Sequence, residues 1–202
     1  MYITEIKEIN SQKNQIKSDN GIAFVLYKGD LSKYGIQIGE VDDDIIEEII
    51  NEVLPKRALN RAVKIITGRD MTEGMIKDKL KGDGYSDEII EDVLERLRKE
   101  RLVNDERFVR GFIESKSLKK SKKDIIIALS MKGINPELSE RIYDELKNDG
   151  DLCEEEELIR KLLDKRHFDY ENSDFETKQK EMQYLLRKGF SSDSIRSAMK
   201  NE

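Results

Sequence analysis

Apolar residues recur at helical spacing through most of the chain. Ile90, Val93 and Leu97, for example, are separated by three and four positions, which places them on one face of a helix. The same spacing recurs in most of the stretches that follow. A mainly α-helical protein is therefore predicted.

The first forty residues have a different pattern. A run of apolar, aromatic and β-branched residues, 21–27, follows the turn signal 18–21, and Asn20-Gly21 is a strong hairpin cue. A small β-hairpin or β-meander ending near Gly39 is predicted. A linking helix should follow, because the acids at 42–44 suit the positive end of a helix dipole. Pro55 is expected to end this helix.

One short pattern occurs three times: Leu, three residues, Gly, an apolar residue, and a residue type that caps helices. Its glycines are Gly84, Gly133 and Gly189, which lie 49 and 56 residues apart. A glycine just past a helix end adopts the left-handed conformation without penalty. The next residue then folds back onto the residue five positions earlier, and Ser86, Asn135 or Ser191 caps the following helix.

Three helices are expected around each junction, so three tandem three-helix units are predicted. Each unit has a small core, and neighbouring units are expected to stack into an elongated, curved array. The expected helices are 57–67, 72–82 and 86–99, then 105–117, 121–131 and 135–148, then 154–164, 174–187 and 191–200. The expected domains are 1–55 (β-hairpin plus helix), 56–103, 104–150 and 151–202.

Composition narrows the functional class. Charged residues make up 40% and hydrophobic residues 37%, a balance that suits a thin stack of amphipathic helices. No apolar run is long enough to span a membrane, and the N-terminus lacks the pattern of a secretory signal. A single cysteine cannot form an internal disulfide. A cytoplasmic protein is expected.

Little in the sequence indicates catalysis. Phosphate-binding glycine loops are absent, and Cys153 and His167 are the sole members of their types. A nucleophile–base pair of these two is a weaker interpretation than an incidental cysteine and a loop histidine. The acids 154–157 fit a solvated helix start better than a cation site. No catalytic residue, metal or cofactor is therefore expected.

A basic segment stands out against the net charge of −6. Residues 93–132 carry 12 basic and 6 acidic side chains, whereas both flanking regions are acidic. Such a cluster is either a solvated helix face or a contact for phosphates or an acidic partner. No aromatic residues alternate with its lysines, so base stacking by this segment is not indicated. The candidate contacts are Arg96, Arg98, Arg101, Arg107, Arg110, Lys116, Lys119, Lys120, Lys122 and Lys123.

Several ordered motifs together resemble the RecX family of regulatory proteins. The run 69–85 looks like the first RecX repeat, 102–108 like the junction into the second, and 125–134 like the centre of the second. The stretch 184–191 resembles the third repeat, and 1–35 resembles the extension of Gram-positive members. Arg101 departs from this pattern, because the family commonly has glycine there.

The resemblance implies a regulator that binds within the groove of the RecA filament on single-stranded DNA. It implies effects on DNA recombination, DNA repair and the SOS response, through reduced recombinase, ATPase and coprotease activity of RecA. A monomer is expected. The alternative is a helical protein that binds nucleic acid directly through residues 96–123.

Overall fold

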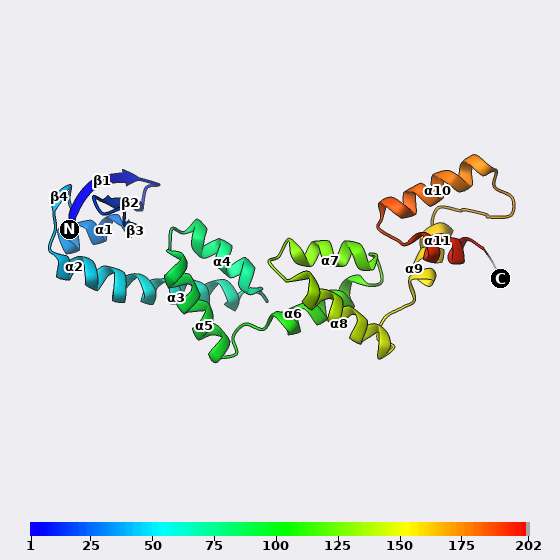
Figure 1. The fold of residues 1–202 in the computed structure, drawn as a ribbon. Coiled ribbons are helices and arrows are strands. Elements are labelled where there is room, and N and C mark those ends of the chain that lie inside the picture. Colours follow the sequence, from blue (N-terminus) through cyan, green and yellow to red (C-terminus); the bar gives the residue numbers. More distant parts are fainter. Residues whose placement is uncertain (201–202) are drawn as a thin grey trace. The chain divides into compact units, whose positions relative to one another are not determined.

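The computed structural model describes residues 1–200. The chain folds as two compact units, Met1–Asn104 and a second that begins at Asp105. The predicted fold class is confirmed: the protein is mainly helical, with a small antiparallel sheet at its N-terminus (Figure 1). The helices after the sheet pack in groups of three.

The N-terminal sheet has four strands in the order β3-β2-β1-β4. They are β1 (Tyr2–Glu8), β2 (Lys13–Ser18), β3 (Ala23–Tyr27) and β4 (Gly39–Glu40). In the central register Ile16 pairs with Ile6 on one side and Phe24 on the other. Ile16 is fully buried, so alternate positions of the central strand face the core. Gly21 lies in the predicted turn with a φ of +82°.

A short helix interrupts the region predicted to consist of strands. This helix, α1 (Lys28–Tyr34), lies between β3 and β4 and ends at Gly35, which has a φ of +65°. Asp30 stabilises its first turn by accepting a hydrogen bond from the Tyr27 amide at 3.0 Å. The Asp30 carboxylate also pairs with the Arg57 guanidinium, with Nη2 donating to Oδ1 at 2.7 Å. This partner is 27 residues away, so the local sequence pattern does not reveal it.

The prediction that Pro55 ends the linking helix was wrong. Helix α2 (Asp43–Glu48), the π-helical turn η1 (Ile49–Val53) and α3 (Leu54–Thr67) form one continuous helix (Figure 1). In the π-turn the Leu54 amide donates to the Ile49 carbonyl, five residues back. The wider turn leaves room for the proline ring, so Pro55 is accommodated inside the continuous helix.

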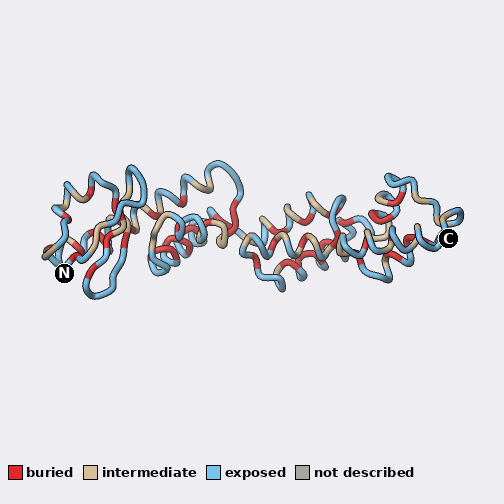
Figure 2. Tube along the Cα trace, turned by 90° about the horizontal axis from the view of Figure 1, so that it is seen from above, coloured by how far each residue is buried: buried red, intermediate tan, exposed pale blue. Residues whose placement is uncertain are grey.

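The remaining helices agree with the predicted ones to within a few residues. They are α4 (Glu73–Gly82) and α5 (Asp87–Lys99) in the first unit, and α6 (Asp105–Lys116), α7 (Lys122–Ser130), α8 (Pro136–Asn148), α9 (Glu155–Asp164), α10 (Phe175–Arg187) and α11 (Ser192–Met199) in the second. Buried positions recur along the inner faces of these helices (Figure 2). They form three cores: one shared by the sheet and α2–α5, one within α6–α8 and one within α9–α11.

The three predicted glycine turns are confirmed. Gly84, Gly133 and Gly189 have φ angles of +91°, +78° and +81°. In each turn the next amide donates to the carbonyl five residues back, for example Tyr85 to Leu80 at 3.2 Å. The predicted caps also form, since the hydroxyls of Ser86 and Ser191 and the side-chain oxygen of Asn135 accept amide hydrogen bonds.

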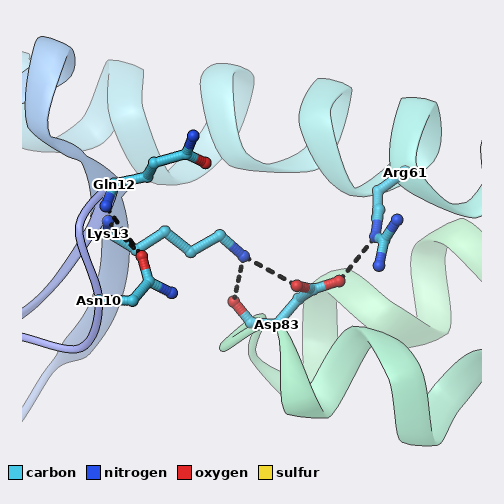
Figure 3. A network of polar contacts seen from close by, with 5 residues as sticks. All are labelled: Asn10, Gln12, Lys13, Arg61 and Asp83. Atoms are coloured by element: carbon cyan, nitrogen blue, oxygen red, sulfur yellow. Dashed lines mark hydrogen bonds and ion pairs between the residues drawn. The ribbon is translucent and has the colours of Figure 1, made fainter.

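The first glycine turn also packs against the N-terminal sheet. Lys13 Nζ lies 2.8 Å from Asp83 Oδ1, and Arg61 Nε lies 2.7 Å from Asp83 Oδ2 (Figure 3). Burial raises the pKa of Asp83, but its hydrogen bonds to Lys13 and Arg61 more than offset this and leave the pKa below its usual range. Next to it, a Cβ on Gly84 would lie 2.3 Å from Val25 Cγ2. The sheet, α3 and the α4–α5 turn therefore belong to one packed unit.

Candidate interaction surface

The basic candidates lie in both compact units. Three of them, Arg96, Arg98 and Arg101, belong to the end of α5 and the turn after it, in the first unit. The others belong to the second unit. They lie on α6 (Arg107, Arg110, Lys116), in the turn before α7 (Lys119, Lys120) and in the first turn of α7 (Lys122, Lys123).

Several of the arginines make ion pairs that support the fold. Arg98 donates two hydrogen bonds of 2.7 Å to Glu73 and so joins α5 to α4. Arg110 Nη2 lies 3.1 Å from a Glu145 carboxylate oxygen and joins α6 to α8. Paired guanidinium groups have less capacity to attract a further anion. These arginines are therefore weaker contact candidates than their charge suggests.

Two of the lysines pack against their own three-helix group. Lys122 Nζ lies 2.5 Å from Asp144 Oδ1 and 5.2 Å from the centroid of the Tyr143 ring. Lys116 Nζ lies 6.0 Å from the centroid of the Phe112 ring. Both side chains thus have partners inside the protein, which the sequence pattern did not indicate.

Three lysines have no such partner. Lys119, Lys120 and Lys123 are exposed, and within residues 1–200 no side chain makes an ion pair or hydrogen bond with their ammonium groups. The turn that carries the first two is held by their amides, which donate to the Lys116 carbonyl at 2.9 and 3.0 Å. Ser121 then caps α7 by accepting from the Asp124 amide at 3.2 Å. Three uncompensated cations are therefore held close together, two in the turn before α7 and one in the first turn of α7.

Apolar side chains lie beside these cations. Lys123, Ile127 and Met131 are spaced four residues apart and so share one face of α7 and its C-terminal end. Ile127 is 47% and Met131 84% exposed, whereas Ile125 and Leu129 on the opposite face are fully buried. We call Lys119, Lys120, Lys123, Ile127 and Met131 the α7 surface. Sequence reasoning missed its apolar part, although the spacing from Lys123 to Met131 was available as a signal.

The α7 surface borders a groove. Ile126 and Ile127 of α7, Leu186 of α10 and Phe190 of the following turn line a hollow of about 610 Å³. The α7 wall of the groove is joined to the α10 wall at Ser121, whose hydroxyl donates to the Lys188 carbonyl at 2.7 Å. An apolar centre bordered by charged groups is the usual composition of a protein–protein interface.

The candidate catalytic pair and the candidate cation ligands of the sequence do not form a common site. Cys153 is exposed before α9, and His167 lies in the turn after α9 with a φ of +55°. Of the acids 154–157, Glu157 pairs with Lys161 at 2.7 Å and Glu154 with Lys147 at 3.3 Å. Across residues 1–200 there is no group of three or more side chains suited to hold a metal ion. In the same range no helix has the length and apolar character needed to cross a membrane.

Comparison with known proteins relates the chain to one family. Residues 154–199 match the profile described as "RecX, third three-helix domain", and residues 58–97 match "RecX, first three-helix domain". The chain is 30% identical over 206 residues to the regulatory protein RecX of Clostridium acetobutylicum, covering 98% of this chain and 94% of the relative. It is 29% identical to that of Caldanaerobacter subterraneus subsp. tengcongensis, covering 98% of each chain.

Solved structures agree with this relationship. A crystal structure of regulatory protein RecX superposes with a TM-score of 0.62 at 25% identity, covering 97% of this chain and 98% of that one. The RecX crystal structure from Lactobacillus salivarius has the same TM-score, 0.62, at 23% identity over 72% of this chain, and supports the fold.

Proposed function

The chain belongs to the RecX family of regulatory proteins, and on this premise we propose that it regulates the RecA recombinase. It binds the filament that RecA forms on single-stranded DNA and lowers the recombinase, ATPase and coprotease activities of that filament. It acts by binding rather than by catalysis, as a monomer, in the cytoplasm. The relatives that match almost the whole chain are named regulatory proteins, which supports a regulatory role.

The α7 surface is the part of the protein that we assign to the filament contact. The observation that carries this assignment is the position of Lys119, Lys120 and Lys123, exposed and unpaired beside exposed apolar side chains. These exposed groups add nothing to the stability of the fold. A partner that covers them buries the apolar side chains and pairs with the cations. An acidic protein surface of the filament satisfies both requirements.

Direct binding of nucleic acid is the second candidate function. The same three lysines favour it, because phosphates release counterions when cations approach them. The exposed Ile127 and Met131 favour a protein partner instead, since phosphates gain nothing from apolar side chains. Binding to bare single-stranded DNA and to RecA-coated DNA at equal salt separates the two. Strong preference for the coated form supports filament regulation, whereas equal affinity with a steep salt dependence supports direct binding.

Changing Lys119, Lys120 and Lys123 together to Gln tests the assigned surface. Potency in a RecA ATPase assay should fall about tenfold, because each interfacial ion pair contributes a few tenths to one kcal/mol. The matched control changes Lys7, Lys64 and Lys79 to Gln, which removes the same charge from exposed positions of the first unit. Equal potency of the two triple variants, at low and high salt, would refute the assignment of the α7 surface.

A further inference from the structure

The three-helix group α9–α11 contains an exposed aromatic side chain that lies outside its hydrophobic core. Phe175 is the first residue of α10 and is 76% exposed. The helix start does not need this ring, because Asp174 supplies the cap by accepting from the Thr177 amide at 2.7 Å. Among residues 1–200 no other ring or cation stacks on Phe175. Its π-face is therefore open to a ligand.

Phe175 belongs to the wall of a mostly apolar hollow of about 320 Å³. Tyr170, from the α9–α10 connection, and the side chains of Met182 and Met199 form other parts of the wall. A single exposed ring is common on protein surfaces and needs no explanation. Phe175, however, borders an apolar hollow. A planar ligand that stacks on its ring can therefore also contact the apolar wall of the hollow.

The same hollow is bordered by cations from three places in the chain. They are Lys178 on α10, Arg196 on α11 and Lys200 just after α11. No acidic residue of the described chain is among the residues that line it. Lys178 Nζ lies 4.3 Å from the centroid of the Tyr170 ring, so that face of Tyr170 is already covered. Phe175 remains as the stacking surface, with Arg196 and Lys200 available to an anion.

The cationic character of this hollow is local. Tyr170 also borders a second hollow, whose lining includes Asp164, Asp169 and Glu171 together with one cation, Arg160. Acidic residues outnumber basic ones there, so an anionic ligand is favoured in the hollow at Phe175. This contrast orients a ligand whose charged group must lie next to its planar group.

From this arrangement we propose that the hollow at Phe175 binds one unpaired nucleotide of a single-stranded nucleic acid. The base stacks on Phe175, and its phosphate is held by Arg196 and Lys200. Exposed aromatic rings beside cations are the usual means of binding single strands without sequence preference. An acidic peptide would satisfy the cations but leave the Phe175 ring uncovered. The site lies outside the α7 surface and does not depend on RecA.

A tryptophan at position 175 makes the stacking directly visible. The chain has no tryptophan, so Phe175→Trp introduces a single emitter at the site. The full-length protein also carries the Gln changes at Lys119, Lys120 and Lys123, which removes binding through the α7 surface. Titration with oligothymidylate should quench the tryptophan emission, whereas an abasic strand of equal length and charge should leave it unchanged.

Anisotropy of a labelled oligothymidylate provides a second measurement that does not rely on the new tryptophan. In the same background, Phe175→Leu should weaken binding about fivefold or more, because it keeps an apolar side chain but removes the ring. Changing Arg196 and Lys200 to Gln should weaken binding at low salt and have less effect at high salt.

Three results would overturn the proposal. The first is unchanged tryptophan emission at an oligonucleotide concentration that saturates the anisotropy signal. The second is a Phe175→Leu variant that binds the thymidylate strand as tightly as its parent. The third is displacement of the oligonucleotide from the site by a glutamate-rich peptide of equal charge, which would assign the hollow to an acidic protein segment.

Discussion

At the scale of single residues, left-handed backbone positions mark many of the helix ends. Three of them are the predicted glycines, and Gly150 forms a fourth after α8 with a φ of +79°. Arg101 and His167 occupy the same kind of position with φ angles of +55°. After each of these two residues, the next amide donates to a carbonyl five positions back. The turn therefore forms without glycine, but at a steric cost.

Replacing Arg101 by glycine should stabilise the protein. The left-handed conformation penalises a side chain with a Cβ, so Arg101→Gly should gain about 0.5–1 kcal/mol. Arg96→Gly, inside helix α5, serves as the control and should lose about 1 kcal/mol. Urea unfolding of both variants gives the comparison. If Arg101 contacts the RecA filament, the stabilised variant should also bind the filament more weakly.

The glycines also differ in what surrounds them. A Cβ on Gly189 would lie 2.7 Å from Ser121 Oγ and 3.3 Å from Lys123 Cβ, whereas a Cβ on Gly150 would meet nothing within 4 Å. Both Ala variants bear the left-handed penalty, and Gly189→Ala also disturbs the hydrogen bond from Ser121 to the Lys188 carbonyl. Gly189→Ala should therefore lose at least about 1 kcal/mol more than Gly150→Ala. Equal midpoints in urea would contradict this interpretation of the contact.

At the scale of elements, ion pairs join helices that the sequence pattern treats as separate. Asp30 of α1 pairs with Arg57 of α3, and the Asp30 side chain is 9% exposed. Hydrogen bonds from Arg57 hold the pKa of Asp30 below its usual range. A depressed folded-state pKa contributes stability above the unfolded-state pKa. That contribution is lost as the pH falls through the folded-state value.

Asp30→Asn should therefore cost about 2–3 kcal/mol at pH 7, since a charged hydrogen-bonded pair is broken. The difference in unfolding free energy between the wild type and this variant should shrink as the pH falls below about 4. Urea titrations at pH 7, 4 and 2.5 measure it. Asp78→Asn, at an exposed position of α4, is the control and should change stability little at any of these values. A difference that stays constant with pH would rule out the ion pair as its cause.

At the scale of the whole molecule, the cores follow the two compact units. The buried residues of the sheet and α2–α5 all precede residue 104, and those of α6–α11 all follow it. Fragments 1–104 and 105–202 should therefore each fold alone, with helical circular dichroism and a cooperative melt. Fragment 1–86 is the control. It lacks Val93, Leu94 and Leu97 of the first core and should not melt cooperatively. A non-cooperative melt of both longer fragments would show that the units depend on each other.

The sequence by itself was sufficient for the helix boundaries from α4 (Glu73–Gly82) onward, to within a few residues. Turns such as Gly84–Tyr85 and caps such as Ser86 depend on hydrogen bonds within about five residues, so the local pattern contains the whole signal. The family was likewise evident from the order and spacing of short motifs, because these follow the same local turns and caps.

Tertiary structure decided everything that depends on residues far apart in the chain. It placed Arg57 against Asp30, and it used Arg98 and Arg110 in ion pairs while leaving Lys119, Lys120 and Lys123 free. It also brought Phe175, Arg196 and Lys200 around one hollow. Which charges are neutralised and which rings are covered is a property of packing, because a side chain's partner depends on its neighbours in space. Spacing along the sequence carries that information only within a few helical turns.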